Sequence, residues 1–117
     1  MKYVMVIYQG DALERQAALP EDEQKQVYAD YGALNSTPGV EPGLPLGLPE
    51  HATTVRVEDG KTLTTDGPFV GMKEAVGGFF VLEADDLDAA IEVAARVPAA
   101  RLGGAIEIRP SEAYWQK

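Results

Sequence analysis

The sequence contains no cysteine, and it has a single histidine and a single tryptophan among its 117 residues. Without a thiol, the chain cannot form disulfides, a Cys-ligated zinc site or an iron–sulfur cluster, and it has no thiol nucleophile. One histidine among acidic residues lacks the spaced ligand set that transition-metal sites normally show. We therefore expect neither a bound metal nor a required cofactor.

Basic residues are scarce: the chain has 10 Lys and Arg against 19 Asp and Glu, which gives a formal net charge of -9. The few basic residues are scattered, so nucleic acids and anionic membranes are poor partners for this surface. The apolar run at residues 2–8 is too short for a signal-peptide core followed by a cleavage site, or for a membrane span. We expect a cytoplasmic protein.

What the chain does have is ordinary globular composition, with 45% hydrophobic and 25% charged residues. This favours one folded domain over residues 1–117. Residues 2–8 are β-branched and aromatic with apolar residues on both faces, which predicts a central strand that is covered on both faces. Pro20 and the acids after it predict a helix that ends near Asn35, with Val27, Tyr31 and Leu34 as its buried stripe. Residues 9–18 are a polar connection with some helical character, and we assign no secondary structure to them.

Asp59-Gly60 is a strong signal for a two-residue type I′ turn, because both positions accept positive φ. It predicts a hairpin of residues 53–58 and 61–66 that pairs Glu58 with Lys61 and Arg56 with Leu63. Before it, residues 36–49 contain four prolines and three glycines. This composition predicts a connection, with a short extended piece at residues 46–48.

Two strands and a helix are expected in the last third of the chain. Residues 76–83 predict a strand, and Asp85 is placed to cap the helix that follows, which Pro98 stops. The predicted stripe of that helix is Leu87, Ala90, Ile91, Ala94 and Val97.

Alternation in the last strand, residues 105–109, sends Ile106 and Ile108 to one face and Glu107 and Arg109 to the other. The order of elements predicts an α+β, ferredoxin-like sandwich with an extra β-hairpin. Both helices would cover one sheet face. The other face would need a partner, so we expect a homodimer in which two sheets close a barrel-like space.

Several short motifs occur in a fixed order along the chain. They are Thr54-Val55-Arg56, Asp66-Gly67-Pro68-Phe69, Lys73-Glu74, Gly77-Gly78-Phe79 and Glu107-Ile108-Arg109-Pro110. In this set the chain resembles the DGPF branch of the YCII-related family, from Tyr3 to Pro110. The resemblance implies a dimeric α+β barrel. It also implies a setting beside extracytoplasmic-function sigma factors, near which members are often encoded.

The wider family was proposed to be enzymatic because a His–Asp pair lies in a cleft, and one branch includes a dehydrochlorinase that acts on a chlorinated hydroxyquinol. This chain departs from the pattern in two places. Val70-Gly71-Met72 stands where an acidic residue is common, and no histidine lies in or just after the first helix. A His–Asp dyad is therefore not carried over.

Asp66 is the candidate catalytic residue, as a general base or polar anchor in a cleft. The alternative is a turn aspartate that accepts backbone hydrogen bonds before Gly-Pro. His51 is a candidate general acid or base but lies outside any motif, and an exposed or hydrogen-bonded loop histidine is the alternative.

Five residues are candidates for substrate binding: Arg56, Lys73, Glu74, Glu107 and Arg109. The arginines suit an anionic substrate, or Arg109 could instead pair with Glu107 of the partner subunit. Lys73 and Glu74 form either a cleft pair or a solvated surface pair.

Two functions of different class follow. The first is a small-molecule binding or regulatory module, linked to sigma-factor regulation, with its cleft near the dimer interface. The alternative is a cofactor-independent lyase or dehydrochlorinase-like enzyme that uses Asp66 as base.

Overall fold

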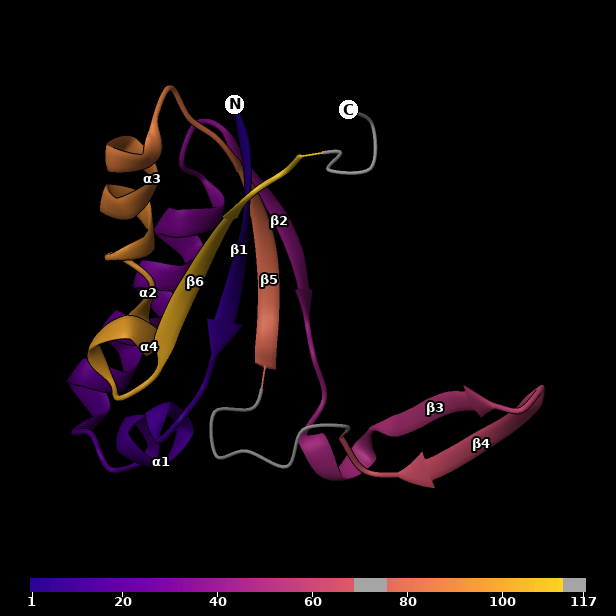
Figure 1. Cartoon of the computed structure of the whole chain (residues 1–117). Helices are drawn as coiled ribbons and strands as arrows, with labels where there is room; N and C mark the ends of the chain where they lie inside the picture. The colour runs from indigo at the N-terminus through magenta and orange to yellow at the C-terminus, as the bar shows by residue number, and fades with distance from the viewer. Residues whose placement is uncertain (69–75, 113–117) are drawn as a thin grey trace.

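The computed structural model describes residues 1–68 and 76–112 (Figure 1). The candidates Lys73 and Glu74, and the motif at residues 70–72, lie outside the described residues. The strands are β1 (Lys2–Tyr8), β2 (Val40–Pro45), β3 (Thr53–Glu58), β4 (Lys61–Asp66), β5 (Val76–Glu83) and β6 (Ala105–Pro110). The helices are α1 (Ala12–Ala17), α2 (Glu21–Asn35), α3 (Leu87–Ala94), α4 (Pro98–Arg101) and the short 3-10 turn η1 (Pro49–His51). The predicted strands and helices occur in the predicted order, and the short elements α1, β2, η1 and α4 are added to them.

Four strands form one antiparallel sheet in the order β2-β5-β1-β6. With the β3–β4 hairpin set aside, this is the strand order of a ferredoxin-like sheet, and it confirms the expected α+β fold. β1 is an interior strand because it pairs with β5 on one side and β6 on the other, and its alternating residues Tyr3, Met5 and Ile7 are buried in the core. The prediction of a central β1 is confirmed, but only one of its faces is covered by helices.

The hydrophobic core lies between this sheet and the helices. On α2, Val27 and Leu34 are buried and Tyr31 packs against the same cluster, as the predicted stripe requires. On β6, Ile106 and Ile108 also pack against the core, so the alternation predicted for the last strand is confirmed. No helix in the described part of the chain is long and apolar enough to cross a membrane.

The predictions for α3 need two corrections. Asp86, not Asp85, is the cap: its backbone is extended directly before Leu87, and its carboxylate accepts a hydrogen bond of 2.9 Å from the Ala89 N–H. The buried face of α3 is Ala90, Val93 and Ala94, and Val97 is buried beyond the end of this helix. Leu87 and Ile91 are about half exposed, because they lie away from that buried face.

The extended piece expected at residues 46–48 lies earlier, as β2 (Val40–Pro45). Its prolines conceal it in the sequence. β2 pairs only with β5, so it is an edge strand, and an edge strand accepts Pro42 and Pro45 because one row of its backbone groups has no strand to bond.

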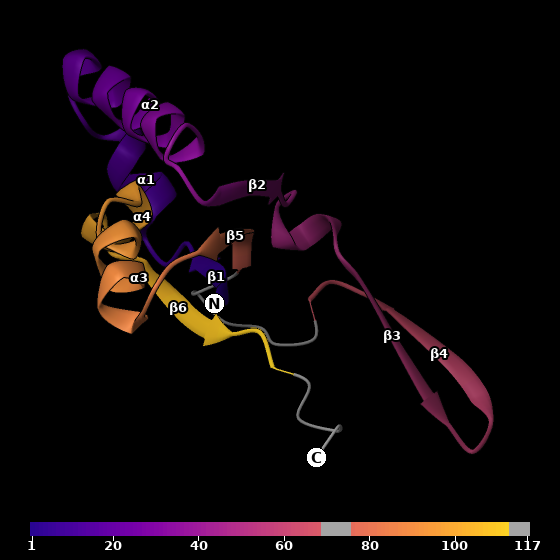
Figure 2. The same ribbon diagram turned by 90° about the horizontal axis from the view of Figure 1, so that it is seen from above.

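The β3–β4 hairpin stands apart from the main sheet and forms a two-stranded sheet of its own (Figure 1). Its turn residues Asp59 and Gly60 both have positive φ, and Glu58 pairs with Lys61 and Arg56 with Leu63. The turn and register predicted from Asp59-Gly60 are therefore confirmed. Seen from above, the hairpin extends away from the helices, on the side of the sheet that they leave uncovered (Figure 2).

Candidate functional site

The sheet face opposite the helices is the main uncovered surface of the fold, and we call it the open face. Alternation along each strand places its members there. They are Lys2, Val4, Val6 and Tyr8 of β1, Glu41 of β2, Phe79, Val81 and Glu83 of β5, and Ala105, Glu107 and Arg109 of β6.

The strand register arranges the open face in rows across the sheet. Val6 lies between Phe79 of β5 and Glu107 of β6. Val4 lies in the next row, between Val81 and Arg109. Phe79 is 41% exposed even though it sits at the middle of a strand. The open face therefore has an apolar centre with charged side chains around it.

Glu107 and Arg109 lie together at one border of the open face. The Arg109 Nε and the Glu107 Oε1 are 3.8 Å apart, and their side chains are 73% and 48% exposed respectively. The sequence placed both on the side opposite the isoleucines, and the structure has them there. On one protomer both side chains face solvent, so any enclosure of this pair requires something to cover the face.

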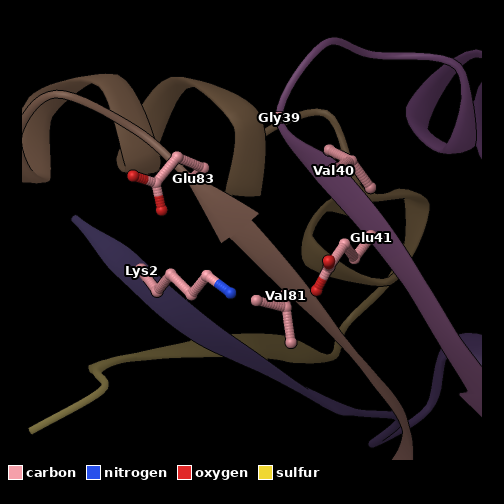
Figure 3. Close-up of a pocket in the computed structure, with 6 residues that line it drawn as sticks. All are labelled: Lys2, Gly39, Val40, Glu41, Val81 and Glu83. Carbon is pink, nitrogen blue, oxygen red and sulfur yellow. The ribbon is translucent and has the colours of Figure 1, made fainter.

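A shallow cavity of about 310 Å³ lies at the opposite border of the open face. It is lined by Lys2, Gly39, Val40, Glu41, Val81 and Glu83. Figure 3 shows the Lys2 side chain extending toward Val81, with the carboxylate of Glu41 beyond it. The cavity thus combines an apolar floor with one ammonium group and two carboxylates, and its volume is at the lower end of the range for small-molecule sites.

One of these carboxylates is already engaged. The Glu83 Oε1 accepts a hydrogen bond of 3.1 Å from the ammonium group of Met1, which also donates to the Ala84 carbonyl at 3.1 Å. This clamp fixes the start of β1 against the end of β5. It leaves Lys2 and Glu41 as the charged groups of the cavity with the most freedom to meet a ligand.

Asp66 and Arg56 lie on the hairpin and not on the open face. Asp66 ends β4 opposite Thr53, while Arg56 is opposite Leu63, so the two side chains point to opposite faces of the hairpin. Arg56 forms an ion pair of 3.2 Å with Glu58 on its own face. Within one protomer, the candidate base and the candidate anion-binding arginine do not converge on one reacting atom.

His51 ends the η1 turn that leads into the hairpin. Its side chain is 74% exposed, and its Nε2 is 3.9 Å from the Glu50 Oε1. Among the described residues, no three His, Asp or Glu side chains gather closely enough to hold a metal ion. No charged side chain in the described part of the chain is buried in the core.

A second cavity, of about 190 Å³, lies on the helical side, beside α2 and α4. There the Arg101 Nη2 donates a hydrogen bond of 2.7 Å to the Asp30 Oδ2. The Gln26 amide bonds the other oxygen of the same carboxylate at 2.8 Å. These two hydrogen bonds, with the Gln26 one as the larger cause, hold the pKa of Asp30 below its usual value. This network ties the helices together, and burial meanwhile raises the pKa of the nearby Tyr31.

Sequence reasoning missed Lys2, Glu41 and Glu83 as neighbours in a cavity. One signal was available, because the rule that separated Glu107 from Ile108 also puts Lys2, Val4 and Val6 on one side of β1. Glu41 carried no such signal, because it lies in the proline-containing strand that was not recognised.

The chain matches the family described as the YCII-related domain over residues 1–112. It is also similar to an uncharacterised protein of Rhizobium meliloti (strain 1021), with 27% identity over 123 aligned positions. That alignment covers 97% of this chain and 94% of the relative. The family match spans every helix and strand described above. This chain belongs to the YCII-related family.

Proposed function

We propose that this protein is a homodimeric module that binds a small molecule on its open face and serves a regulatory role. The observation that carries the proposal is the composition of the open face: an apolar centre in which Val4 and Val6 are partly exposed and Phe79 is 41% exposed, on the side of the sheet away from the helices. Soluble monomers rarely leave the centre of a sheet in this state, and such surfaces mark places of interaction.

A second copy of the chain is the partner that this face fits. A two-fold axis brings the same patch of both copies together. The apolar centres of the two open faces would then pack on each other, and the charged borders of each copy would lie against the rim of the other. Sheets that pack face to face lie about 10 Å apart, which leaves space at the borders where side chains are long and polar. Glu107 and Arg109 on one border and Lys2 and Glu41 on the other would line that space.

The chemistry of the cavity indicates the class of ligand. The Lys2 ammonium beside the apolar Val81 suits a small molecule that has a hydrocarbon part and one anionic group. Arg109 offers a second cation for such a group. The two borders also carry Glu41 and Glu107, so the face does not favour a multiply charged anion such as a polyphosphate.

Binding is a better match to the geometry than catalysis. Asp66, the candidate base, is exposed at the foot of the hairpin, and Arg56 points to the other side of that hairpin. A proton-abstracting lyase needs its base within hydrogen-bond reach of a substrate that the arginines hold. Membership of the DGPF branch and a link to sigma-factor regulation rest on the motif Asp66-Gly67-Pro68-Phe69 and are part of this proposal.

The ligand part is tested by thermal unfolding against a panel of small aromatic and aliphatic carboxylic acids. A binder raises the melting temperature by mass action, by several degrees at a hundredfold excess over its dissociation constant. Lys2→Met should abolish the shift, and Lys61→Met, which removes the same charge at the hairpin turn, should preserve it. A panel without any shift, or a shift that Lys2→Met retains, contradicts a site at this cavity. Turnover of a panel compound that Asp66→Asn abolishes would instead establish the lyase.

A further inference from the structure

The β3–β4 hairpin is a strongly encoded element that pairs with no other strand of the described chain. Its strands are exposed along their length, with Thr54 alone half-buried, and it forms no ladder with the main sheet. Two hydrogen bonds among the described residues link it to its base: the Gly67 N–H donates to the Ala52 carbonyl, and the Thr54 hydroxyl donates to the Gly67 carbonyl. An isolated two-stranded hairpin is marginally stable in water, so an element of this kind needs cover.

The two faces of the hairpin differ in chemistry. The first, which we call the valine–threonine face, consists of Thr53, Val55, Val57, Thr62, Thr64 and Asp66. The second, the charged face, consists of Thr54, Arg56, Glu58, Lys61, Leu63 and Thr65. Val55 and Val57 are 59% and 67% exposed. A β-branched face with a single charge at its foot is typical of a surface that packs against another layer, while the charged face is suited to water.

We propose that the valine–threonine face packs onto a second copy of this chain, so that each protomer clasps its partner with its hairpin. The inference rests on the proposed dimer and adds the hairpin to it. The hairpin extends from the body on the side that the helices leave uncovered, where the partner's sheet would lie (Figure 2). A partner that approaches the open face therefore meets this hairpin as well.

The area of the open face supports a contribution of the hairpin to the dimer interface. With strands about seven residues long, four strands of a sheet measure roughly 440 Å² in plan, so face-to-face packing of two copies buries roughly 900 Å² in all. That is below the roughly 1,000 Å² that a specific interface should exceed. Two hairpins of six-residue strands, each covering roughly 200 Å² of the partner, raise the total to roughly 1,700 Å², the size of a standard stable interface.

Charge substitutions on the two faces of the hairpin distinguish a hairpin that packs on the partner subunit, which we call the clasp, from a hairpin that stays in solvent. Val55→Glu/Val57→Glu puts two acids on the valine–threonine face, and Leu63→Glu/Thr65→Glu puts two acids on the charged face of the same hairpin. Sedimentation velocity over a range of concentrations gives the dimer dissociation constant of each. We expect the first variant to raise it by at least about 100-fold, because two carboxylates lose water without a partner. The second should stay within about threefold of the unchanged chain.

Photo-crosslinking keeps the proposal testable even if the hairpin of Val55→Glu/Val57→Glu fails to fold. The chain has no cysteine, so Thr62→Cys and Thr65→Cys each provide one attachment point for a benzophenone reagent. Thr62 is on the valine–threonine face and Thr65 on the charged face. Irradiation should give a covalent species of twice the 12.6 kDa protomer mass from Thr62→Cys and little from Thr65→Cys.

The outcomes distinguish the clasp from the dimer on which it rests. Equal dissociation constants for both glutamate variants, or equal crosslinking from both cysteines, overturn the clasp and leave a dimer through the open face intact. An unchanged chain that sediments as a monomer at all concentrations overturns the dimer and the clasp together. Covalent dimer from Thr62→Cys alone, together with weaker association of Val55→Glu/Val57→Glu alone, supports both.

Discussion

The guanidinium of Arg109 and the carboxylate of Glu107 lie 3.8 Å apart on the face of β6 that turns away from the core. An ion pair this exposed contributes little to the stability of a single protomer, because water screens both charges. The pair would contribute more to dimerisation if a partner subunit removed that water. Protomer stability and dimer affinity can be measured separately.

Arg109→Gln should leave the free energy of unfolding of the protomer within about 0.5 kcal/mol of the unchanged value, as for other exposed ion pairs. Denaturant titration at low protein concentration measures this. The same substitution should weaken dimerisation by about tenfold or more, because Glu107 is then desolvated without a partner charge. An unchanged dimer dissociation constant would mean that the pair remains in water in the assembled protein.

Asp86→Ala should destabilise the protein by about 1 kcal/mol, since it removes the carboxylate that accepts a hydrogen bond from the Ala89 N–H at the start of α3. Asp85→Ala is the matched control one residue earlier and should cost less than half as much. Chemical denaturation of both variants gives the two values. An equal loss for both, or a larger loss for Asp85→Ala, would show that the cap is assigned to the wrong residue.

Gly104→Ala should destabilise the protein by about 2 kcal/mol, because an added methyl would collide with the backbone carbonyl oxygens of Tyr8, Gln9 and Ala99. Gly32, in the last turn of α2, has open space around it. Gly32→Ala should therefore stabilise the protein by up to about 1 kcal/mol through its higher helix propensity. Melting curves check both signs, and a tolerated Gly104→Ala would contradict the close approach of β6 to the loop after β1.

Stability should respond to pH through Asp30, whose pKa is lowered by its hydrogen bonds to Gln26 and then Arg101. A carboxyl group with a folded-state pKa below its unfolded value of about 3.9 stabilises the fold above that pH, and this contribution is lost as the pH falls through the folded-state pKa. Asp30→Asn should therefore be less stable than the unchanged chain at pH 7, and the difference should disappear in acid.

Melting temperatures between pH 2 and 7 measure this effect. Glu92→Gln on α3 removes the same negative charge elsewhere and corrects for the general relief of repulsion in an acidic protein. A difference between Asp30→Asn and the unchanged chain that persists at the acid end would assign the effect to packing and not to ionisation.

The sequence predicted those features that depend on neighbouring residues. Asp59-Gly60 fixed the turn and register of the hairpin because only a few residues accept positive φ at both positions. The sequence put Ile108 and Arg109 on opposite faces of the last strand because successive side chains of a strand alternate between its two faces. The buried stripe of α2 followed from helical spacing in the same way.

The features that were missed depend on residues that are distant in the sequence. β2 is a strand because it pairs with β5, and its prolines are tolerated only because it lies at the edge. The cavity of Lys2 and Glu41 then depends on β1 and β2 flanking the same strand, which local patterns do not report. Likewise, alternation places Asp66 and Arg56 on opposite faces of the hairpin, but the direction of that hairpin relative to the sheet follows from no periodicity.

The oligomeric states of two variants, one on the open face and one behind it, test most directly whether the open face is the dimer interface. Phe79 is exposed at the centre of the open face and Leu87 is exposed to a similar degree on α3, behind the sheet. Sedimentation equilibrium should find the unchanged chain and Leu87→Asp as dimers and Phe79→Asp as a folded monomer, because the buried aspartate lacks a partner charge. Dimers of Phe79→Asp as tight as those of the unchanged chain would contradict an interface on the open face.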